Sequence, residues 1–460
     1  MFEPTAAGAW SSAFLWSKAG LLGRACPTTG TLGKPQSSVG DVVFAHRILH
    51  AELEFREVFE QGGFDAIVGN PPFLNGLESA TAPAAAVAAL IRATSGGAVH
   101  GYADAAAAFL EAGSRWLAPG GRLALLQPQS ILGSRDARAI RTALLDRCSL
   151  TDLWISNERM FEDASVYVCL PVLERARTEI RSITCFAGPD FRRVGSRASA
   201  PTTLSARDHW SALTALANGA PEIDVPDAPV FAEVAHATAD FRDQYYGLAG
   251  FIVEDSGLEP GVRDASAFPR ILTSGLIDLA DSRWGRDPAR LHKRRWLAPR
   301  VDRRRVEREG TLGPWMAARL VPKVLLATQT SVLEVVVDER GEWLPSTPVL
   351  TIVPKHGYDV WLVAAALASP VACVVAYTRS AGTALTADAI KLGAAQVRQL
   401  PLPTDRHLWR RGATLFQEAQ SGRDRDATLA EFGRVMCAAH GGSAKTQSEV
   451  LAWWEDRLRT

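Results

Sequence analysis

The sequence has no run of about 18 apolar residues, no basic-then-apolar leader and no excess of either charge. Its 50 lysines and arginines are balanced by 50 aspartates and glutamates, so the formal net charge is zero. We therefore expect no membrane span and a cytoplasmic location. An anionic partner has to be met by a local basic patch, because the chain has no global positive field.

Metal-ligand patterns are also missing. The six cysteines form no CxxC pair, and the nine histidines form no cluster with them. Scattered cysteines in apolar segments are typical of small core residues in a reducing compartment. We therefore expect no metal site. The sequence shows no PD-(D/E)xK pattern either, so it does not predict DNA cleavage.

The 460 residues are enough for two or three domains. Residues 1–45 pass from an apolar stretch into Gly, Thr, Pro and Ser, which predicts an irregular segment. In residues 46–200, strands alternate with helices, which predicts an open, mostly parallel α/β sheet covered on both faces. The boundary to the next domain is expected in the loosely patterned residues 187–230.

The elements expected within residues 46–200 follow from their hydrophobic periodicity. We predict a strand over Phe64–Val68, a helix over Tyr102–Leu117 that "APGG" ends, and a strand that ends at Pro128. A helix over Ala137–Asp146 and a strand over Leu150–Ser156 follow. Two further strands of antiparallel type are expected in "ASVYVCLPVLER" and "RSITCFA".

The remaining sequence has a different character. Residues 225–405 contain short strands, turns and one apolar helix over Val360–Tyr377, which predicts an α+β domain. Residues 406–460 predict a helical tail.

The stretch "FDAIVGNPPFLNG" places four unusual residues directly after a strand, in the order Asn70, Pro71, Pro72 and Phe73. The two prolines prevent further ladder pairing and stiffen the backbone. Ligands of open α/β sheets bind beyond the carboxyl ends of the strands. The Asn70 amide and the Pro71 carbonyl offer acceptors, and Phe73 offers a flat apolar face. This combination suits a planar ring with an exocyclic amino group, such as adenine.

Three blocks extend the pattern in a fixed order: "HAELEFREVFEQGGFDAIVGNPPFLNG", "YADAAAAFLEAGSRWLAPGGRLALLQPQSILGS" and "ERMFEDASVYVCLPVLER". In this order they resemble the later half of TaqI-like adenine-specific DNA methylases of restriction-modification and phage-defence systems. The resemblance covers roughly residues 45–176 and, more weakly, 240–405. It implies a partial Rossmann-like methyltransferase sheet, incomplete at its N-terminal side, that uses S-adenosylmethionine. Protein-glutamine and RNA-guanine methylases carry similar loops, so the loop alone is less specific than the three blocks.

The resemblance also implies roles for individual residues. Asn70 and the Pro71 carbonyl would hold the amino group of a flipped base, within the rigid loop that Pro72 completes. Phe73 would stack on that base, and Phe161 would contact its other side. Ordinary core packing is the alternative for Phe161. The resemblance gives supporting roles to Asp65, Tyr102 and Asp104.

The family's cofactor loop is not evident. Its members carry a glycine-rich Asp/Asn-Pro-x-x-Gly-x-Gly loop well before the Asn-Pro-Pro-Phe loop, and residues 1–69 do not spell one. The cofactor-binding residues therefore stay unknown. A truncated reading frame, a decayed remnant and a second polypeptide that supplies this half are the three explanations.

A basic stretch, Asp281–Arg308, holds eleven lysines and arginines against four acidic residues. Clustered arginines with interleaved tryptophans suit a phosphate backbone, whereas a solvated surface run is the alternative. The following segments resemble a DNA target-recognition domain. We therefore predict contacts with double-stranded DNA from Arg294, Arg295, Arg303, Arg304, Arg305 and Lys323.

The sequence thus favours an adenine-N6 DNA methyltransferase that needs a missing N-terminal half. Two alternatives stay open. One is a non-catalytic DNA-binding remnant or specificity subunit of a restriction-modification or phage-defence system. The other is a methylase of an RNA or protein amino or amide group.

Overall fold

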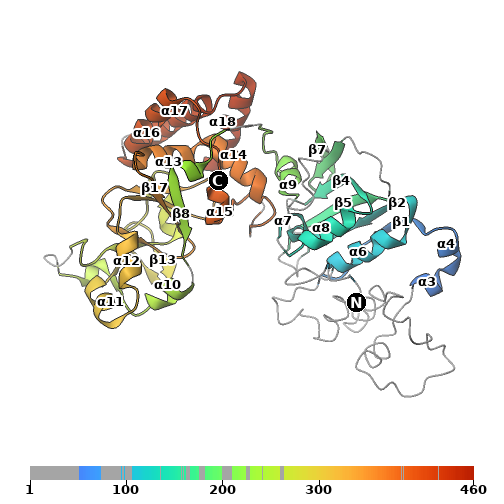
Figure 1. The fold of residues 1–460 in the computed structure, drawn as a ribbon, viewed down its shortest axis with the longest axis horizontal. Helices are drawn as coiled ribbons and strands as arrows, with labels where there is room; N and C mark the ends of the chain where they lie inside the picture. The colour runs from blue at the N-terminus through green and yellow to red at the C-terminus, as the bar shows by residue number, and fades with distance from the viewer. Residues whose placement is uncertain are drawn as a thin grey trace, which may run out of the picture. The chain divides into compact units, whose positions relative to one another are not determined.

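The computed structural model divides into two compact units, Met1–Gly219 (unit 1) and Ala220–Thr460 (unit 2). Both appear in Figure 1, unit 1 in blue to green and unit 2 in green to red. The structure describes residues 51–73, 95, 98, 106–134, 136–156, 158, 160–161, 166–175, 182–198, 210–223, 228–240, 242–259, 264–384, 386, 388–422 and 424–459.

Unit 1 contains a seven-stranded sheet in the order β1-β2-β5-β4-β6-β7, with β3 paired to β5. Strands β1 and β2 are parallel, β5 is antiparallel to both β2 and β4, and β4 and β6 are parallel. Hence β1, β2, β4 and β6 run in one direction, and their carboxyl ends meet at one edge of the sheet. The strands are β1 (Phe64–Gly69), β2 (Leu117–Leu125), β3 (Gln127–Pro128), β4 (Ser149–Ile155), β5 (Val168–Glu174), β6 (Ser182–Ala187) and β7 (Arg192–Ala198).

Helices α6, α8 and α9 share one hydrophobic core with this sheet. The alanine-rich α6 packs closely because Gly113 lies against β2, where an added Cβ would come within 2.9 Å of Leu123 Cδ1. Large side chains such as Leu110, Leu153 and Trp210 fill the space between these helices and the strands. The described helices of unit 1 are α3 (Ala51–Glu54), α4 (Arg56–Glu60), α6 (Ala106–Trp116), α7 (Ser130–Gly133), α8 (Arg138–Leu145) and α9 (Ser211–Ala217).

The prediction of a mostly parallel sheet is wrong for the described strands. Only β1–β2 and β4–β6 are parallel there, because β5 inserts in the opposite direction between β2 and β4. "ASVYVCLPVLER" and "RSITCFA" do form strands β5 and β6, but they are not neighbours. On the face of β1 opposite the core, Val68 is 81% exposed.

The "APGG" segment ends the helix as predicted, but it belongs to strand β2 and not to a loop. Helix α6 stops at Trp116, and β2 begins at once. Gly120 donates its N–H to the Arg175 carbonyl, and Gly121 accepts from the Arg175 N–H, so these residues continue the ladder with the chain that follows β5. Gly121 is required because an added Cβ would lie 2.5 Å from the Phe64 carbonyl oxygen.

Unit 2 is an α+β arrangement built on two four-stranded sheets, β18-β10-β15-β9 and β17-β16-β19-β8, with hairpins β11–β12 and β13–β14. The strands are β8 (Ala235–Ala239), β9 (Ile252–Glu254), β10 (Arg270–Leu272), β11 (Ile277–Asp278), β12 (Asp281–Ser282), β13 (Ala289–Leu291), β14 (Arg294–Trp296), β15 (Pro299–Val301), β16 (Lys323–Leu326), β17 (Val335–Asp338), β18 (Trp343–Pro345) and β19 (Leu350–Pro354).

Helices of unit 2 lie mainly after the second sheet, and the last three form the predicted C-terminal helical segment (Figure 1). Short 3-10 turns η2 (Phe231–Glu233), η3 (Asp255–Gly257) and η5 (Ser274–Leu276) join the strands. The helices are α10 (Arg242–Gly247), α11 (Arg303–Glu309), α12 (Gly313–Arg319), α13 (Val360–Ala368), α14 (Pro370–Ser380), α15 (Ala394–Val397), α16 (Arg406–Gln420), α17 (Arg425–Ala439) and α18 (Ala444–Leu458).

The single apolar helix predicted over Val360–Tyr377 is two helices, α13 and α14, which meet at an angle of 56°. Pro370 cannot continue the hydrogen bonding of α13, and the Ser369 side chain caps α14 by accepting from the Ala372 N–H. No single helix among the described residues is long and apolar enough to cross a membrane; the α13–α14 pair reaches that length only across its bend.

Candidate functional site

The candidate site lies where β1 and β4 end at the same edge of the unit 1 sheet. Both strands run in the same direction, so the loops that follow them leave from one edge. The Leu126 N–H donates to the Gly69 carbonyl at 3.0 Å, which ties the end of β1 to the end of β2. The Asn70–Phe73 loop follows β1, and the segment that leads to Phe161 follows β4.

The amide of Asn70 is exposed at this edge, and it has no hydrogen-bond partner among the residues that the structure describes. Pro71 is buried behind it, whereas Pro72 and Phe73 are half-buried. The ring of Pro71 therefore anchors the loop while the neighbouring amide stays available. An unpaired amide on a fixed backbone can accept and donate hydrogen bonds to a ligand without rearranging.

Phe73 and Phe161 come together although they are far apart in the sequence. Their ring centroids are 6.0 Å apart and their planes are nearly perpendicular, at 83°. Both rings are only half-buried. The structure thus brings the two aromatic residues predicted to contact a base to one place, where they touch each other edge to face, so a base between them would have to part the rings.

Two glutamines that the sequence interpretation did not select brace this edge. The Gln129 side chain donates to the Ser156 carbonyl at 2.6 Å and to the Val168 carbonyl at 3.2 Å, joining the end of β4 to the start of β5. The Gln127 side chain donates to the Ala106 carbonyl at 3.1 Å, and its buried Oε1 has no partner. The signal was present as two amides in "LALLQPQS", a strand end that is otherwise apolar.

The structure describes only one of the three residues with predicted supporting roles, Asp65. Asp65 is exposed near the start of β1, roughly 16 Å of extended chain away from Asn70, and its supporting role stays a prediction. Tyr102 and Asp104 lie outside the described residues. No glycine-rich strand-to-helix loop occurs among the described residues of unit 1, so they offer no cradle for S-adenosylmethionine.

In unit 2, the basic stretch contains both paired and unpaired arginines. On α11, Arg303 pairs with Glu307 at 2.7 Å, and Arg305 pairs with Glu309 at 3.0 Å and lies over the Phe251 ring. Arg304 is exposed on the same helix. On β14, Arg294 and Arg295 are exposed. The β14 pair is thus more available to an anion than Arg303 and Arg305 are.

Lys323 is not a DNA contact, and the prediction for it is wrong. Its side chain is 0% exposed, and its Nζ forms an ion pair with Asp338 on the neighbouring strand β17. Asp338 also accepts from the Glu342 and Trp343 N–H groups, at 3.0 and 2.9 Å. Burial lowers the pKa of Lys323, and Asp338 opposes that shift. The residue therefore serves the core of the β16–β17 pair.

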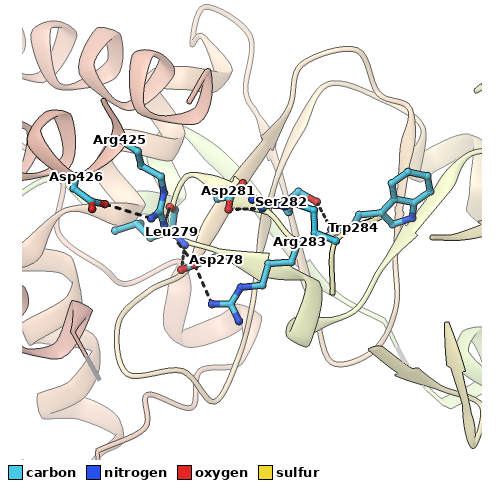
Figure 2. A network of polar contacts seen from close by, with 9 residues as sticks. Asp278, Leu279, Asp281, Ser282, Arg283, Trp284, Arg425 and Asp426 are labelled. Carbon is cyan, nitrogen blue, oxygen red and sulfur yellow. Dashed lines mark hydrogen bonds and ion pairs between the residues drawn. The ribbon is translucent and has the colours of Figure 1, made fainter. Parts of the chain in front are cut away.

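Arg283, another residue of the basic stretch, belongs to a polar network drawn in Figure 2. Its Nη2 lies 3.0 Å from Asp278 Oδ2, and Arg425 of α17 reaches the same oxygen at 3.5 Å. Arg425 also donates to the Leu279 carbonyl at 2.7 Å. Burial, and then the Asp278 charge, raises the pKa of the nearby Glu334 carboxyl to about 7, against the opposing pull of Arg283 and Arg425. This cluster joins the β11–β12 hairpin to the C-terminal helices.

Residues 40–161 match the family of Eco57I restriction-modification methylases. This segment contains β1, the Asn70–Phe73 loop, α6, β2 and β4, and it ends at Phe161, so both aromatic residues of the candidate site fall within it. We call it the methylase segment. No curated protein matches the sequence closely enough to count as a relative.

One solved structure agrees at the level of the fold, and a second is similar over less of its geometry. The Type IIL restriction-modification enzyme MmeI, solved in complex with DNA, has a TM-score of 0.52 at 10% identity, covering 92% of this chain and 58% of MmeI. The type IIG restriction endonuclease BpuSI has a TM-score of 0.34 at 11% identity, covering 87% of this chain and 55% of BpuSI. The chain therefore spans less than two thirds of either enzyme's length.

Proposed function

We propose that this chain carries the target-base site and the DNA-recognition unit of an adenine-N6 DNA methyltransferase of a restriction-modification system. The observation that carries the proposal is the exposed Asn70 at the carboxyl end of β1, whose amide has no hydrogen-bond partner among the described residues, at the edge where Phe73 meets Phe161. The position of these residues inside the methylase segment supports the same reaction class.

In this proposal the loop acts on the amino group of the base. Asn70 Oδ1 and the Pro71 carbonyl oxygen accept its two N–H bonds, which increases the electron density on a nitrogen that is otherwise a poor nucleophile. S-adenosylmethionine supplies the methyl group when it is bound. Positioning and electrostatics provide most of the rate, and the methyl transfer itself needs no general base.

The adenine has to leave the duplex to reach this edge, because its amino group is inaccessible inside the base stack. Extruding a base costs a few kcal/mol. Stacking on an aromatic ring returns about 1–3 kcal/mol per base. The half-buried rings of Phe73 and Phe161 are suited to this because they are fixed against one another but still partly accessible.

We further propose that the cofactor half of the sheet pairs along β1, whether a second polypeptide or another part of the natural protein supplies it. β1 is the terminal strand of the described sheet, with one described neighbour, β2. Its Val68 is 81% exposed, which is unusual for a valine in the strand that carries the site. A strand and helix added at this edge would cover that side chain.

The proposal is tested by methyl transfer from labelled S-adenosylmethionine to plasmid DNA, with the chain alone and with a polypeptide that carries the glycine-rich loop. We expect N6-methyladenine in the digested product. Asn70→Ala should lower the rate by at least about 10²-fold, as loss of one transition-state hydrogen bond does, while DNA affinity stays unchanged. Gln61→Ala, an exposed amide just before β1, is the matched control.

Equal loss of DNA binding in Asn70→Ala would contradict the assigned role. If the labelled methyl group is found in cytosine, RNA or protein, the proposed adenine substrate is wrong and that molecule takes its place. A second candidate is a DNA-binding subunit without catalysis. It predicts DNA binding with no methyl transfer under either condition.

A further inference from the structure

The hairpin β13–β14 has an unusual turn. Arg290 pairs with Arg295 and Leu291 with Arg294, so only His292 and Lys293 form the loop. Both loop residues have positive φ, 49° and 65°. A two-residue turn of this kind matches the twist of the strands but favours asparagine and glycine. Bulkier residues there cost about 1–3 kcal/mol each, so other contacts have to hold the turn.

Those contacts come from the core of unit 2. The Tyr245 hydroxyl accepts from the His292 N–H at 2.9 Å, and the two rings lie 4.1 Å apart with an interplanar angle of 31°. The Trp296 Nε1 donates to the Leu291 carbonyl at 3.1 Å. Leu291 is buried, and Tyr245 and Trp296 pack against the same cluster. Contacts of Tyr245 and Trp296 with the hairpin thus hold the turn in place.

The four cations of the hairpin are Arg290, Lys293, Arg294 and Arg295. All are exposed, and none has an ion-pair partner among the residues that the structure describes. Arg290 and Arg295 lie directly opposite one another on the two strands. Like charges in that position repel, and a bound anion relieves the repulsion. The hairpin is therefore pre-arranged to receive negative charge.

Helix α11 follows within the same basic stretch and provides the contrast. Arg303 pairs with Glu307, and Arg305 and Arg308 both pair with Glu309. A phosphate that approached Arg303, Arg305 or Arg308 would compete with Glu307 or Glu309, whereas Arg304 is exposed and has no ion-pair partner among the described residues. The stretch that looks uniformly basic in sequence therefore contains a hairpin whose cations lack carboxylate partners among the described residues and a helix on which three of the four arginines share two glutamates.

We propose that the β13–β14 hairpin, and not α11, is the element that reads duplex DNA. A two-stranded ribbon fits the major groove of B-DNA, which is about 12 Å wide. Arg290 and Arg295 project from paired positions and face base edges, for which arginine favours guanine. Lys293 and Arg294 at the tip contact phosphates. This inference rests on the proposed function, since it assigns specificity residues to the same DNA-binding unit.

The test measures binding of the full chain to a fluorescent DNA duplex over a range of salt concentrations. We compare the double variants R290Q/R295Q and K293Q/R294Q with R303Q/R308Q. The last variant also removes two positive charges, but from α11. We expect K293Q/R294Q to lower the salt slope by about two and both hairpin variants to weaken binding at least about tenfold. R290Q/R295Q should also lose the sequence preference that the unaltered chain shows when it selects from a random duplex pool. R303Q/R308Q should bind almost as the unaltered chain does.

Binding losses confined to R303Q/R308Q would overturn the hairpin assignment while leaving the proposed methyltransferase intact. Retention of sequence preference by R290Q/R295Q would overturn the base-reading role. Stronger binding to duplex RNA than to duplex DNA would also overturn it, because the deep, narrow major groove of RNA does not admit a ribbon. If R290Q/R295Q still methylates single-stranded DNA at the unaltered rate, its active site is intact. The loss of sequence preference is then a defect of duplex recognition alone.

Discussion

Unit 2 uses lysine and arginine in opposite ways in its interior and on its β13–β14 hairpin. Inside, Lys323 is bonded to Asp338, and both side chains are almost completely buried. On the hairpin, four cations face solvent without ion-pair partners among the described residues. A buried charge has to be matched within the fold, because leaving it unpaired costs several kcal/mol. An exposed charge carries no such constraint and is free for a ligand.

The largest effect is expected from Lys323→Ala. It leaves Asp338 buried without its countercharge, which costs about 3–5 kcal/mol of unfolding free energy. Urea denaturation followed by tryptophan fluorescence measures the change. The double variant Lys323→Met with Asp338→Asn should recover most of the stability, because no charge is then left unpaired. If Lys323→Ala leaves stability unchanged but lowers DNA affinity, Lys323 contacts DNA and is not a core residue.

A smaller change in the free energy of unfolding is expected when pH titrates the Glu334 carboxyl. Because the folded pKa of Glu334 is about 7, against an ordinary value of 4.5, the folded state binds the proton more tightly than the unfolded state does. This carboxyl therefore favours folding below about pH 4.5, and that contribution is lost as pH rises towards 7, to a total of about 3 kcal/mol.

Glu334→Gln should remove this slope, since it carries no titrating proton. The measurement is the difference in unfolding free energy between the two proteins across that pH range. Parallel pH profiles for the two proteins would show that the carboxyl titrates normally in the network of Asp278, Arg283 and Arg425.

The smallest effect on stability is expected from Arg294→Ala with Arg295→Ala. Exposed side chains outside any network change stability by no more than about 0.5 kcal/mol, and here the removal of like charges also relieves repulsion. Thermal unfolding measures it. A loss comparable to that of Lys323→Ala would mean that the hairpin charges are structural, and the contrast between the two regions would disappear.

Much of unit 1 was predictable because its signals are local. The strand Phe64–Val68 is confirmed as β1, and the helix Ala137–Asp146 is confirmed as α8 within a residue at either end. The direction of β5 was not predictable, because an apolar strand does not indicate which neighbours it will have. The roles of Asn70 and Phe161 in base binding stay predictions.

The basic stretch shows the same division. The pairing of Arg303 with Glu307 and of Arg305 with Glu309 could be read from their spacing of four residues on a helix. The burial of Lys323 could not, because Asp338 lies opposite it only through the register of β16 and β17. The ion pair of Arg283 with Asp278 could not be read from the sequence either, because it depends on the β11–β12 hairpin.

The sequence alone determined the rigid corner after β1, because two prolines end a strand and fix the backbone wherever they occur. It also determined which residue types stand there: an amide and an aromatic ring. Only the tertiary structure decided that Phe161 meets Phe73, and which side chains, among them the Asn70 amide and the hairpin cations, have no polar partner among the described residues. These outcomes depend on which distant strands become neighbours, and that choice is made by burial of the whole core.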